Sequence, residues 1–196
     1  MTATLSVIAG PMFSGKTQEL IRQVHRVGFT GDQVQIFKPN LDNRWGKTCS
    51  VRSHAGGECE AVPIKNPREI WQKLKKTTTL IAIDEVQFFP NTIVNLIEKI
   101  IKNNIKVIVS GLPTDFRGEP FGPMPILLAK ADFITHLTAI CTYVNGDNRP
   151  CGRPATRTQR LIEGQPAKYT DPIILIGATD SYAARCPAHH IVPGKP

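Results

Sequence analysis

Residues 10–17 have the spacing G-x-x-x-x-G-K-[ST], which suits the binding of phosphate groups. The glycines let the backbone turn so that several N–H groups point at phosphate oxygens. Lys16 supplies a positive charge for the β- and γ-phosphates, and the hydroxyl of Thr17 can ligate Mg²⁺. A chance glycine-rich turn is the alternative. We predict a site for a nucleoside triphosphate that contains Gly10, Pro11, Met12, Phe13, Ser14, Gly15, Lys16 and Thr17.

Two acidic residues, Asp84 and Glu85, follow the apolar stretch at 80–83. Ligands of open α/β sheets lie at the carboxyl ends of the strands, where these two side chains would stand. Asp84 is therefore predicted to hold Mg²⁺ together with Thr17, and Glu85 could serve as a general base. The alternative is that both acids only begin a loop. The guanine signature Asn-Lys-x-Asp does not occur in the sequence, which favours ATP over GTP.

Cysteine and histidine gather near the carboxyl end. Three of the five cysteines, Cys141, Cys151 and Cys186, lie beyond residue 140, where a metal site must be considered. Two residues separate Cys186 from His189, which is the spacing of a metal knuckle. The odd number of cysteines and an amino terminus without basic residues argue against secretion, so we expect a reducing, cytoplasmic location.

Short apolar runs alternate with amphipathic stretches through the first two thirds of the chain. This alternation predicts an α/β fold with a parallel sheet that helices cover on both faces. Residues 38–60 are polar and are expected to form a long surface loop. The predicted strands are 5–9, 33–37, 80–83, 106–110 and 133–139, and the predicted helices are 18–27, 67–75 and 91–103.

The alternating pattern stops near residue 140, so we predict two domains. A nucleotide-binding α/β domain would span 1–139, a small metal-stapled domain 140–192, and a tail 193–196. The net charge of +8 is diffuse, and a small polyanion such as a nucleotide accounts for it as well as a nucleic acid does. No apolar run approaches the length of about 18 residues that would predict a membrane span.

Four segments, 10–17, 84–89, 110–122 and 137–141, resemble in order and spacing the thymidine kinases of the cellular, zinc-containing type. The resemblance extends from Leu5 to about Val192. It implies transfer of the ATP γ-phosphate to the 5′-hydroxyl of thymidine or deoxyuridine, which yields the nucleoside monophosphate and ADP in pyrimidine salvage. It further implies a RecA-like core, a zinc-bearing lasso domain, a homotetramer, and feedback inhibition by thymidine triphosphate.

The resemblance also assigns roles to individual residues. It makes Glu85 the catalytic carboxylate, adds Asp84, Val86 and Gln87 to the ATP site, and sets Arg44 near the transferred phosphate. Core packing is the alternative for Tyr182 and for the side chains that would surround the thymine base. A solvated loop charge is the alternative for Arg44. The implied nucleoside contacts are Met12, Phe88, Leu112 and Phe116 around the base, Thr158 by the 5-methyl group, a strand of Ile173, Ile174, Leu175, Ile176 and Gly177 along the base edge, and Tyr182.

Two features depart from the family pattern. Pro113 stands where an acidic residue is common, and proline removes a donor and fixes φ. The family's first ligand pair is Cys-x₂-Cys, whereas nine residues separate Cys141 from Cys151 here. We interpret the residues around 145–147 as a turn that lengthens the knuckle. The zinc ligands implied by the resemblance are Cys141, Cys151, Cys186 and His189, with His190 as the alternative ligand and Cys49 and Cys59 as ordinary thiols.

Two other functions remain open on the sequence. A RecA-like ATPase with a zinc ribbon would act on nucleic acid, and a related kinase would act on another small acceptor. The absence of a concentrated basic stripe favours the nucleoside kinase over the first of these.

Overall fold

The computed structural model describes residues 3–40, 50–52, 58–144, 146, 148–174 and 181–196. Several predicted residues lie outside this set: Arg44, Cys49, Leu175, Ile176 and Gly177.

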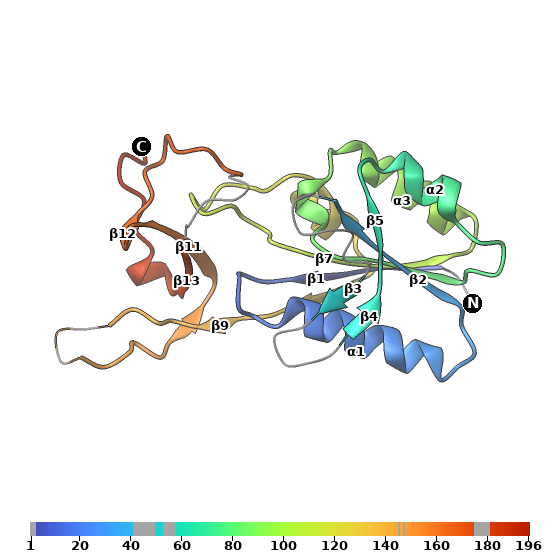
Figure 1. Cartoon of the computed structure of the whole chain (residues 1–196), viewed down its shortest axis with the longest axis horizontal. Coiled ribbons are helices and arrows are strands. Elements are labelled where there is room, and N and C mark those ends of the chain that lie inside the picture. Colours follow the sequence, from blue (N-terminus) through green and yellow to red (C-terminus); the bar gives the residue numbers. More distant parts are fainter. Residues whose placement is uncertain (1–2, 41–49, 53–57, 145, 147, 175–180) are drawn as a thin grey trace.

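A parallel sheet forms the centre of the fold, as predicted (Figure 1). Within the described residues it has six strands in the order β5-β2-β6-β7-β1-β8. The strand before the phosphate loop, β1, is separated from the strand before Asp84, β6, by β7. This is the arrangement of a RecA-like sheet. The strands are β1 (Leu5–Ala9), β2 (Val34–Pro39), β5 (Val62–Ile64), β6 (Leu80–Ile83), β7 (Lys106–Gly111) and β8 (Phe133–His136).

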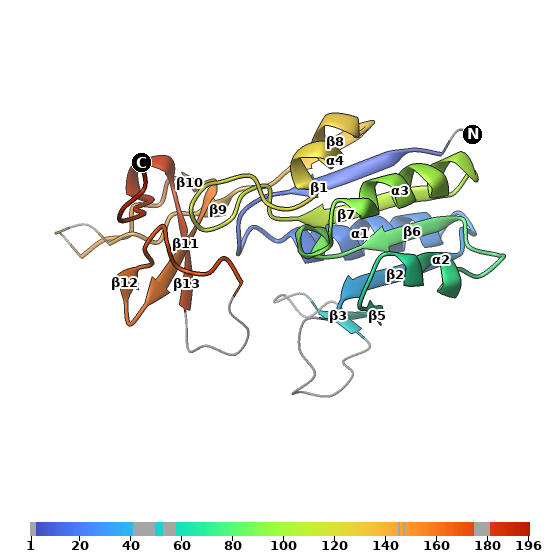
Figure 2. The same ribbon diagram turned by 90° about the horizontal axis from the view of Figure 1, so that it is seen from above.

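Helices cover both faces of the sheet (Figures 1 and 2). Successive strand residues point to opposite faces, so Val7 and Ile8 of β1 belong to different cores. On the face of Ile8, α1 (Lys16–Gly28) contributes Leu20, Ile21 and Val24. The other face is covered by α2 (Arg68–Lys73), α3 (Thr92–Lys102) and α4 (Met124–Lys130). No described helix combines the length and the apolar character needed to cross a membrane.

The predicted helices are confirmed with small shifts at their ends. Helix α1 begins at Lys16, inside the phosphate loop, and includes Gly28, which we expected to end it. Helix α2 ends at Lys73 rather than near residue 75. Helix α4 was not predicted, because it is short and contains Pro125 within its first turn. Its Met124 and Leu127 are nevertheless fully buried.

The expectation of an irregular loop over 38–60 is wrong in part. The segment contains an antiparallel pair, β3 (Ser50–Arg52) and β4 (Glu58–Glu60). These strands have three residues each and mostly polar side chains. Pairing between segments, and not an apolar period, therefore defines them, which is why the sequence pattern does not reveal them.

The carboxyl-terminal region, residues 139–196, forms separate antiparallel sheets beside the large sheet (Figure 1). Strand β9 (Ala139–Ile140) pairs with β10 (Pro154–Ala155), so the predicted strand 133–139 is in fact two strands, β8 and β9. Strand β11 (Arg157–Ile162) lies between β12 (Gln165–Pro166) and β13 (Ser181–Arg185). The exact domain boundary at residue 140 stays a prediction.

The predicted strand 173–177 is wrong for its two described residues. Ile173 and Ile174 lie in a bend and an irregular segment, and both are exposed to solvent. Their apolar character therefore does not reflect burial in a sheet. The other three residues of that predicted strand lie outside the described part of the chain.

Candidate active site and metal site

The phosphate loop connects the end of β1 to the start of α1. A Cβ on Gly10 would lie 2.6 Å from both the Leu137 carbonyl oxygen and Ser14 Oγ, so only glycine fits this position. Gly15 has φ of +81°, which glycine adopts without strain. The hydroxyl of Ser14 donates to the Pro11 carbonyl over 2.8 Å and closes the loop on itself. The first turn of α1 thus points its free N–H groups at the loop's interior.

Lys16 is buried at the start of α1, and its Nζ donates to the Pro11 carbonyl at 2.8 Å. Burial lowers the pKa of Lys16, while the nearby carboxylates of Glu85 and Asp84 act in the opposite direction. The ammonium group is therefore held inside the loop by a neutral acceptor. Phosphate oxygens would be stronger acceptors at the same place.

Asp84, which follows β6, contacts Thr17 of α1. Thr17 Oγ1 donates to Asp84 Oδ2 over 3.1 Å, and Ser110 Oγ donates to Asp84 Oδ1. Mg²⁺ takes oxygen ligands, so a hydroxyl and a carboxylate in contact fit this ion. Ser110 lies at the end of β7, between the two strands that carry the loop and the acid. Sequence reasoning missed Ser110, because only the strand order brings it here.

Glu85 adopts a left-handed backbone with φ of 52° at the start of a short 3₁₀ turn, Val86–Phe88. Burial, followed by the neighbouring Asp84, raises the pKa of the Glu85 carboxyl, and Lys16 opposes this shift. Gln87 donates from Nε2 to Glu85 Oε2 and accepts from the Leu112 backbone N–H at 3.1 Å. The amide of Gln87 therefore links Glu85, the predicted general base, to Leu112, which is predicted to contact the nucleobase.

Gln87 is itself enclosed by two glycines. A Cβ on Gly111 would lie 2.6 Å from Gln87 Oε1, and one on Gly122 would lie 2.3 Å from the Gln87 carbonyl oxygen. A larger residue at Gly111 would displace the amide that contacts Glu85, and one at Gly122 would displace the Gln87 backbone. This cage depends on segments far apart in the sequence, so the motif alone does not indicate it.

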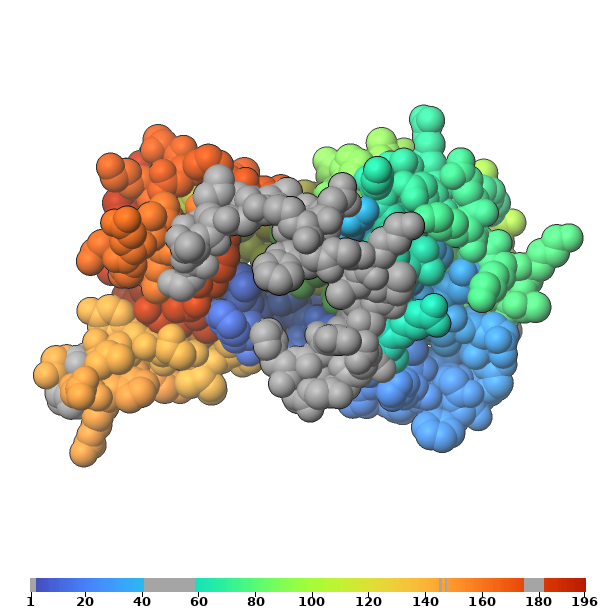
Figure 3. All heavy atoms as spheres, in the orientation of Figure 1, coloured from blue at the N-terminus to red at the C-terminus, as the bar shows by residue number. Residues whose placement is uncertain are grey.

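The residues predicted to surround the base are partly brought together. Leu112 and Phe116 are buried in the segment after β7, whereas Phe88 is half-buried and packs edge-on against Phe121 at 5.5 Å between ring centroids. The Met12 backbone N–H donates to Thr158 Oγ1 at 3.0 Å. The phosphate loop and the carboxyl-terminal region are thus in direct contact, and the space-filling view shows the blue start of the chain meeting the orange and red end (Figure 3).

Other predicted nucleoside contacts are less clearly arranged. Tyr182 is half-buried on β13, directly opposite Arg160 on β11. Ile173 and Ile174 are exposed and make no strand with their neighbours in the described chain. Their predicted role at the base edge remains a prediction.

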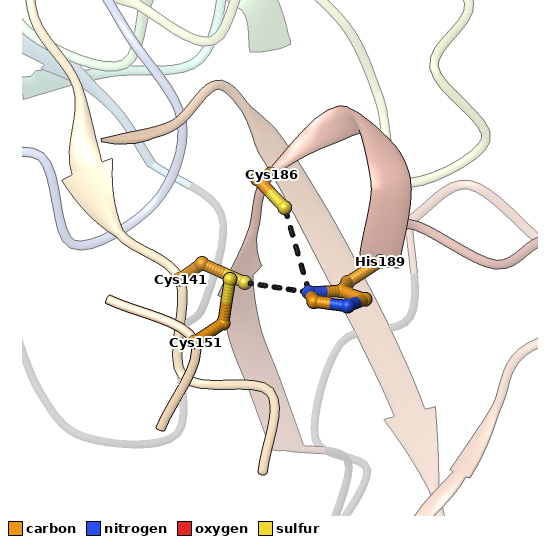
Figure 4. A group of neighbouring side chains, drawn as sticks. All are labelled: Cys141, Cys151, Cys186 and His189. Carbon is orange, nitrogen blue, oxygen red and sulfur yellow. Dashed lines mark hydrogen bonds between the residues drawn. The ribbon is translucent and has the colours of Figure 1, made fainter. Parts of the chain in front are cut away.

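Cys141, Cys151, Cys186 and His189 form one cluster, as predicted (Figure 4). Their candidate ligand atoms all lie within 4.8 Å of one another. His189 Nδ1 is 3.6 Å from the sulfur of Cys141 and 3.5 Å from that of Cys186. Three thiols and one imidazole are a donor set typical of tetrahedral zinc, so these residues could hold such an ion.

The long spacing between Cys141 and Cys151 is accommodated by a narrow hairpin. The Cys151 N–H donates to the Tyr143 carbonyl at 2.7 Å, and the Gly152 N–H donates to the Cys141 carbonyl at 3.1 Å. These bonds return the chain so that both thiols reach the same point. Tyr143 also stacks on the His189 ring at 4.2 Å between centroids, which fixes the orientation of that ligand.

The surroundings of Cys141 favour its thiolate form. Burial raises the pKa of Cys141, but hydrogen bonds from the Cys186 and Tyr143 backbone and from His189 outweigh it and lower the pKa to about 6. Thiolates are the form that binds metal ions.

The alternative ligand His190 does not belong to the cluster. Its Nε2 lies 2.8 Å from the Phe116 carbonyl oxygen, and burial lowers its pKa, so the neutral ring donates to that carbonyl. Cys59 lies apart from the cluster, on β4, with its sulfur 3.3 Å from His25 Nε2.

A RecA-like sheet, a closed phosphate loop and an acidic pair at its edge define a nucleotide-binding protein of the phosphate-loop class. The chain belongs to the thymidine kinase family, whose model, described as "Thymidine kinase", matches residues 3–190. Membership of this family indicates a kinase.

Among solved structures, the chain is similar to the genome packaging NTPase B204 from Sulfolobus turreted icosahedral virus 2, solved in complex with ATP-gammaS. The identity is 17%, the TM-score is 0.44, and the match covers 76% of this chain and 79% of that one. A similarity this low carries no functional conclusion.

Proposed function

We propose that this protein transfers the γ-phosphate of ATP to the 5′-hydroxyl of thymidine or deoxyuridine, which yields the nucleoside monophosphate and ADP for pyrimidine salvage. The observation that carries the proposal is the position of Glu85 between the phosphate loop and Leu112, to which Gln87 links it. A general base at this position can face both a γ-phosphate and an acceptor hydroxyl. Membership of the thymidine kinase family supports thymidine as the acceptor.

ATP binding is assigned to residues 10–17 together with Asp84, Glu85, Val86 and Gln87. The loop N–H groups and the α1 amino terminus would bind the phosphate oxygens. Lys16 would exchange the Pro11 carbonyl for the β- and γ-phosphates. Thr17 and Asp84 would hold Mg²⁺, which neutralises charge on the phosphates when it is bound.

Glu85 is the proposed catalytic base. Its raised pKa makes it a better proton acceptor than an ordinary carboxylate, since a base is most effective when its pKa approaches the working pH. The hydrogen bond from Gln87 holds one carboxylate oxygen, and no hydrogen bond from the described residues occupies the other, which would accept from the 5′-hydroxyl.

The nucleoside would lie between the phosphate loop and the carboxyl-terminal region. Met12, Phe88, Leu112 and Phe116 would surround the base, and Thr158 would lie near the 5-methyl group. The contact between Met12 and Thr158 supports this arrangement. Further contacts are proposed for Tyr182, for residues 173–177 and, at the transferred phosphate, for Arg44.

A structural zinc ion is proposed for Cys141, Cys151, Cys186 and His189, because their donor set and spacing fit tetrahedral coordination. The ion would join the chain before β10 to the chain after β13 and so maintain the antiparallel sheets between them. A cytoplasmic homotetramer and feedback inhibition by thymidine triphosphate are proposed on family membership alone.

Replacing one metal ligand is expected to weaken thymidine binding far more than ATP binding. Cys186→Ser removes a ligand, and metal affinity in such sites is coupled to local folding free energy. The β13 strand with Tyr182 would lose its anchor, whereas the phosphate loop is built from other elements. Metal analysis should find about one zinc per wild-type chain, and calorimetry should give the two affinities. Cys59→Ser serves as the control, since Cys59 lies outside the cluster.

Equal loss of both affinities would contradict that assignment. A Cys151→Ser variant with full metal content and full thymidine affinity would show that Cys151 is not a ligand.

The hairpin between Cys141 and Cys151 is expected to tolerate shortening. Deleting residues 144–150 leaves Thr142 and Tyr143 between the cysteines and retains the ring that stacks on His189. Loop-closure free energy depends only logarithmically on length, so the change in stability should be about 1 kcal/mol or less. Zinc content and thermal unfolding test this expectation. Loss of zinc from the shortened chain would show that the hairpin itself builds the site.

A further inference from the structure

The chain after the last metal ligand returns to the segment after β7, residues 113–122. His190 Nε2 donates to the Phe116 carbonyl at 2.8 Å, and Lys195 Nζ donates to the Arg117 carbonyl at 2.7 Å. Lys195 also pairs with Glu119 at 3.0 Å. Figure 2 shows the yellow-green segment after β7 extending toward the orange and red strands. The carboxyl-terminal region therefore contacts this segment through its backbone as well as its side chains.

Asp115 is the centre of the hydrogen bonds that hold the turn at residues 115–119 together. This buried carboxylate accepts from the N–H groups of Arg117 at 2.9 Å and Glu119 at 3.0 Å, and it pairs with the Arg117 guanidinium at 2.8 Å. A displacement of Arg117 or Glu119 would therefore act on Asp115 and on its neighbour Phe116.

The Phe116 side chain is also held from the carboxyl-terminal region. The guanidinium carbon of Arg160 lies 5.5 Å from the Phe116 ring centroid, a distance at which cation and ring attract each other. Arg160 is fully buried on β11 and donates to the Pro172 carbonyl at 2.6 Å. Both the ring and the carbonyl of Phe116 thus face groups that belong to the metal-bearing part of the chain.

His190 has little freedom to move by itself. On one side it follows His189, whose N–H donates to the Cys186 carbonyl at 3.0 Å in the metal-bearing turn. On the other side Ile191 exchanges two hydrogen bonds with the buried Gln159 side chain, at 2.9 and 2.8 Å. The position of the His190 ring is therefore set by the turn that carries two of the cluster's four side chains.

We propose that His190 is a positioning residue that transmits the order of the metal-bearing turn to Phe116 and thereby sets the shape of the nucleoside slot. The inference rests on the proposed role of Phe116 as a wall of that slot. Loss of the His190 donor leaves a buried carbonyl without its partner, and such a change weakens a dependent interaction by roughly tenfold. The KM for thymidine should rise by about that factor, while the KM for ATP and kcat stay nearly unchanged, because no hydrogen bond joins His190 to the phosphate loop among the described residues.

The test compares His190→Phe, which keeps a ring without a donor, with His190→Gln, whose amide can still donate to the Phe116 carbonyl. His25→Phe is the matched control, since His25 is exposed on α1 and its side chain has a polar contact only with Cys59 among the described residues. The measurements are zinc content, both KM values, and amide hydrogen exchange over residues 113–122. We expect His190→Phe to retain its zinc, to raise the thymidine KM about tenfold, and to speed exchange in this segment. His190→Gln should recover most of the loss.

A second measurement needs no variant. Removing the metal from the wild-type protein with a chelator should speed exchange over residues 113–122, and adding Zn²⁺ should restore protection. This arm stays informative even where His190→Phe does not fold.

The outcomes separate this inference from the proposed function. A wild-type protein that does not phosphorylate thymidine contradicts the proposed function, while the exchange measurements still decide whether His190 orders residues 113–122. The inference is overturned if His190→Phe leaves the thymidine KM and exchange unchanged. It is equally overturned if both KM values rise together, if zinc is lost from the variant, or if metal removal leaves the exchange of 113–122 unaltered.

Discussion

Lys16→Ala is expected to lower kcat/KM at least about a hundredfold, because single electrostatic contacts to a transferring group contribute that much or more. The ammonium is buried inside the phosphate loop, where the charge of a phosphoryl group is poorly screened by water. Among the described residues, the Lys16 ammonium donates a hydrogen bond only to the Pro11 carbonyl, so its other N–H donors are available to a phosphate. The measurement is steady-state thymidine phosphorylation by the purified variant.

The fold should survive this substitution. Burial lowers the pKa of Lys16 in the folded chain, so the unfolded chain binds more protons between the two pKa values, and stability there rises with pH. At neutral pH the burial of this charge opposes folding, whereas its attraction to Glu85 and Asp84 favours folding, so the two effects of its removal offset each other in part. Arg26→Ala, an exposed change on the same helix, is the control and should keep wild-type activity. Near-normal turnover in a folded Lys16→Ala protein would refute the role of the loop in phosphoryl transfer.

Glu85→Gln is expected to lower kcat by roughly 10²–10⁴-fold while thymidine binding is largely retained, since a general base contributes about this factor. The amide preserves the shape of the side chain and removes its ability to accept the proton of the 5′-hydroxyl. Calorimetric titration with thymidine and initial-rate kinetics separate the two effects. Unchanged activity together with lost binding would make Glu85 a binding residue instead of a base.

The raised pKa of Glu85 leads to two further expectations, one for the pH dependence of the wild-type rate and one for the stability of the variant. The wild-type rate should fall, as pH decreases, at a higher pH than an ordinary glutamate would give, because a protonated base cannot accept a proton. The stability of the folded chain changes with pH in the direction opposite to the rate. The folded chain keeps a proton on Glu85 that the unfolded chain has already released, so stability decreases as pH rises through that interval. Glu85→Gln should therefore melt at a higher temperature than the wild type near neutral pH.

Most strands of the large sheet could be predicted because they contain apolar runs, whereas the short β5 strand was not predicted. Residues 80–83 are all buried, and the expected strand matches β6 without a shift. Strands with polar faces could not be recognised in the same way. β11 has the sequence Arg-Thr-Gln-Arg-Leu-Ile, and its buried Thr158, Gln159 and Arg160 are satisfied by partners distant in the chain. Burial of polar side chains is decided by tertiary contacts, which no local period encodes.

The residues of the candidate site differ in the same way, because some follow from local motifs and others depend on tertiary contacts. The phosphate loop and Asp84 follow from contiguous motifs at strand ends, so their meeting through Thr17 could be predicted. Ser110 could not be predicted, because it reaches Asp84 only through the order of the strands. The contact of His190 with Phe116 joins residues far apart in the sequence, and the same residue was a plausible ligand on spacing alone. Geometry separates these two roles where spacing does not.

We propose that this protein consumes ATP only to phosphorylate a pyrimidine deoxynucleoside. The most direct measurement is ADP formation by the purified protein with ATP and Mg²⁺, in the presence and absence of thymidine, with single-stranded DNA and a panel of deoxynucleosides as separate additions. We expect ADP to appear with thymidine or deoxyuridine, in equal amount to the nucleoside monophosphate, and to stay at background with DNA. ADP formation that needs DNA, or that is the same without any nucleoside, would contradict it.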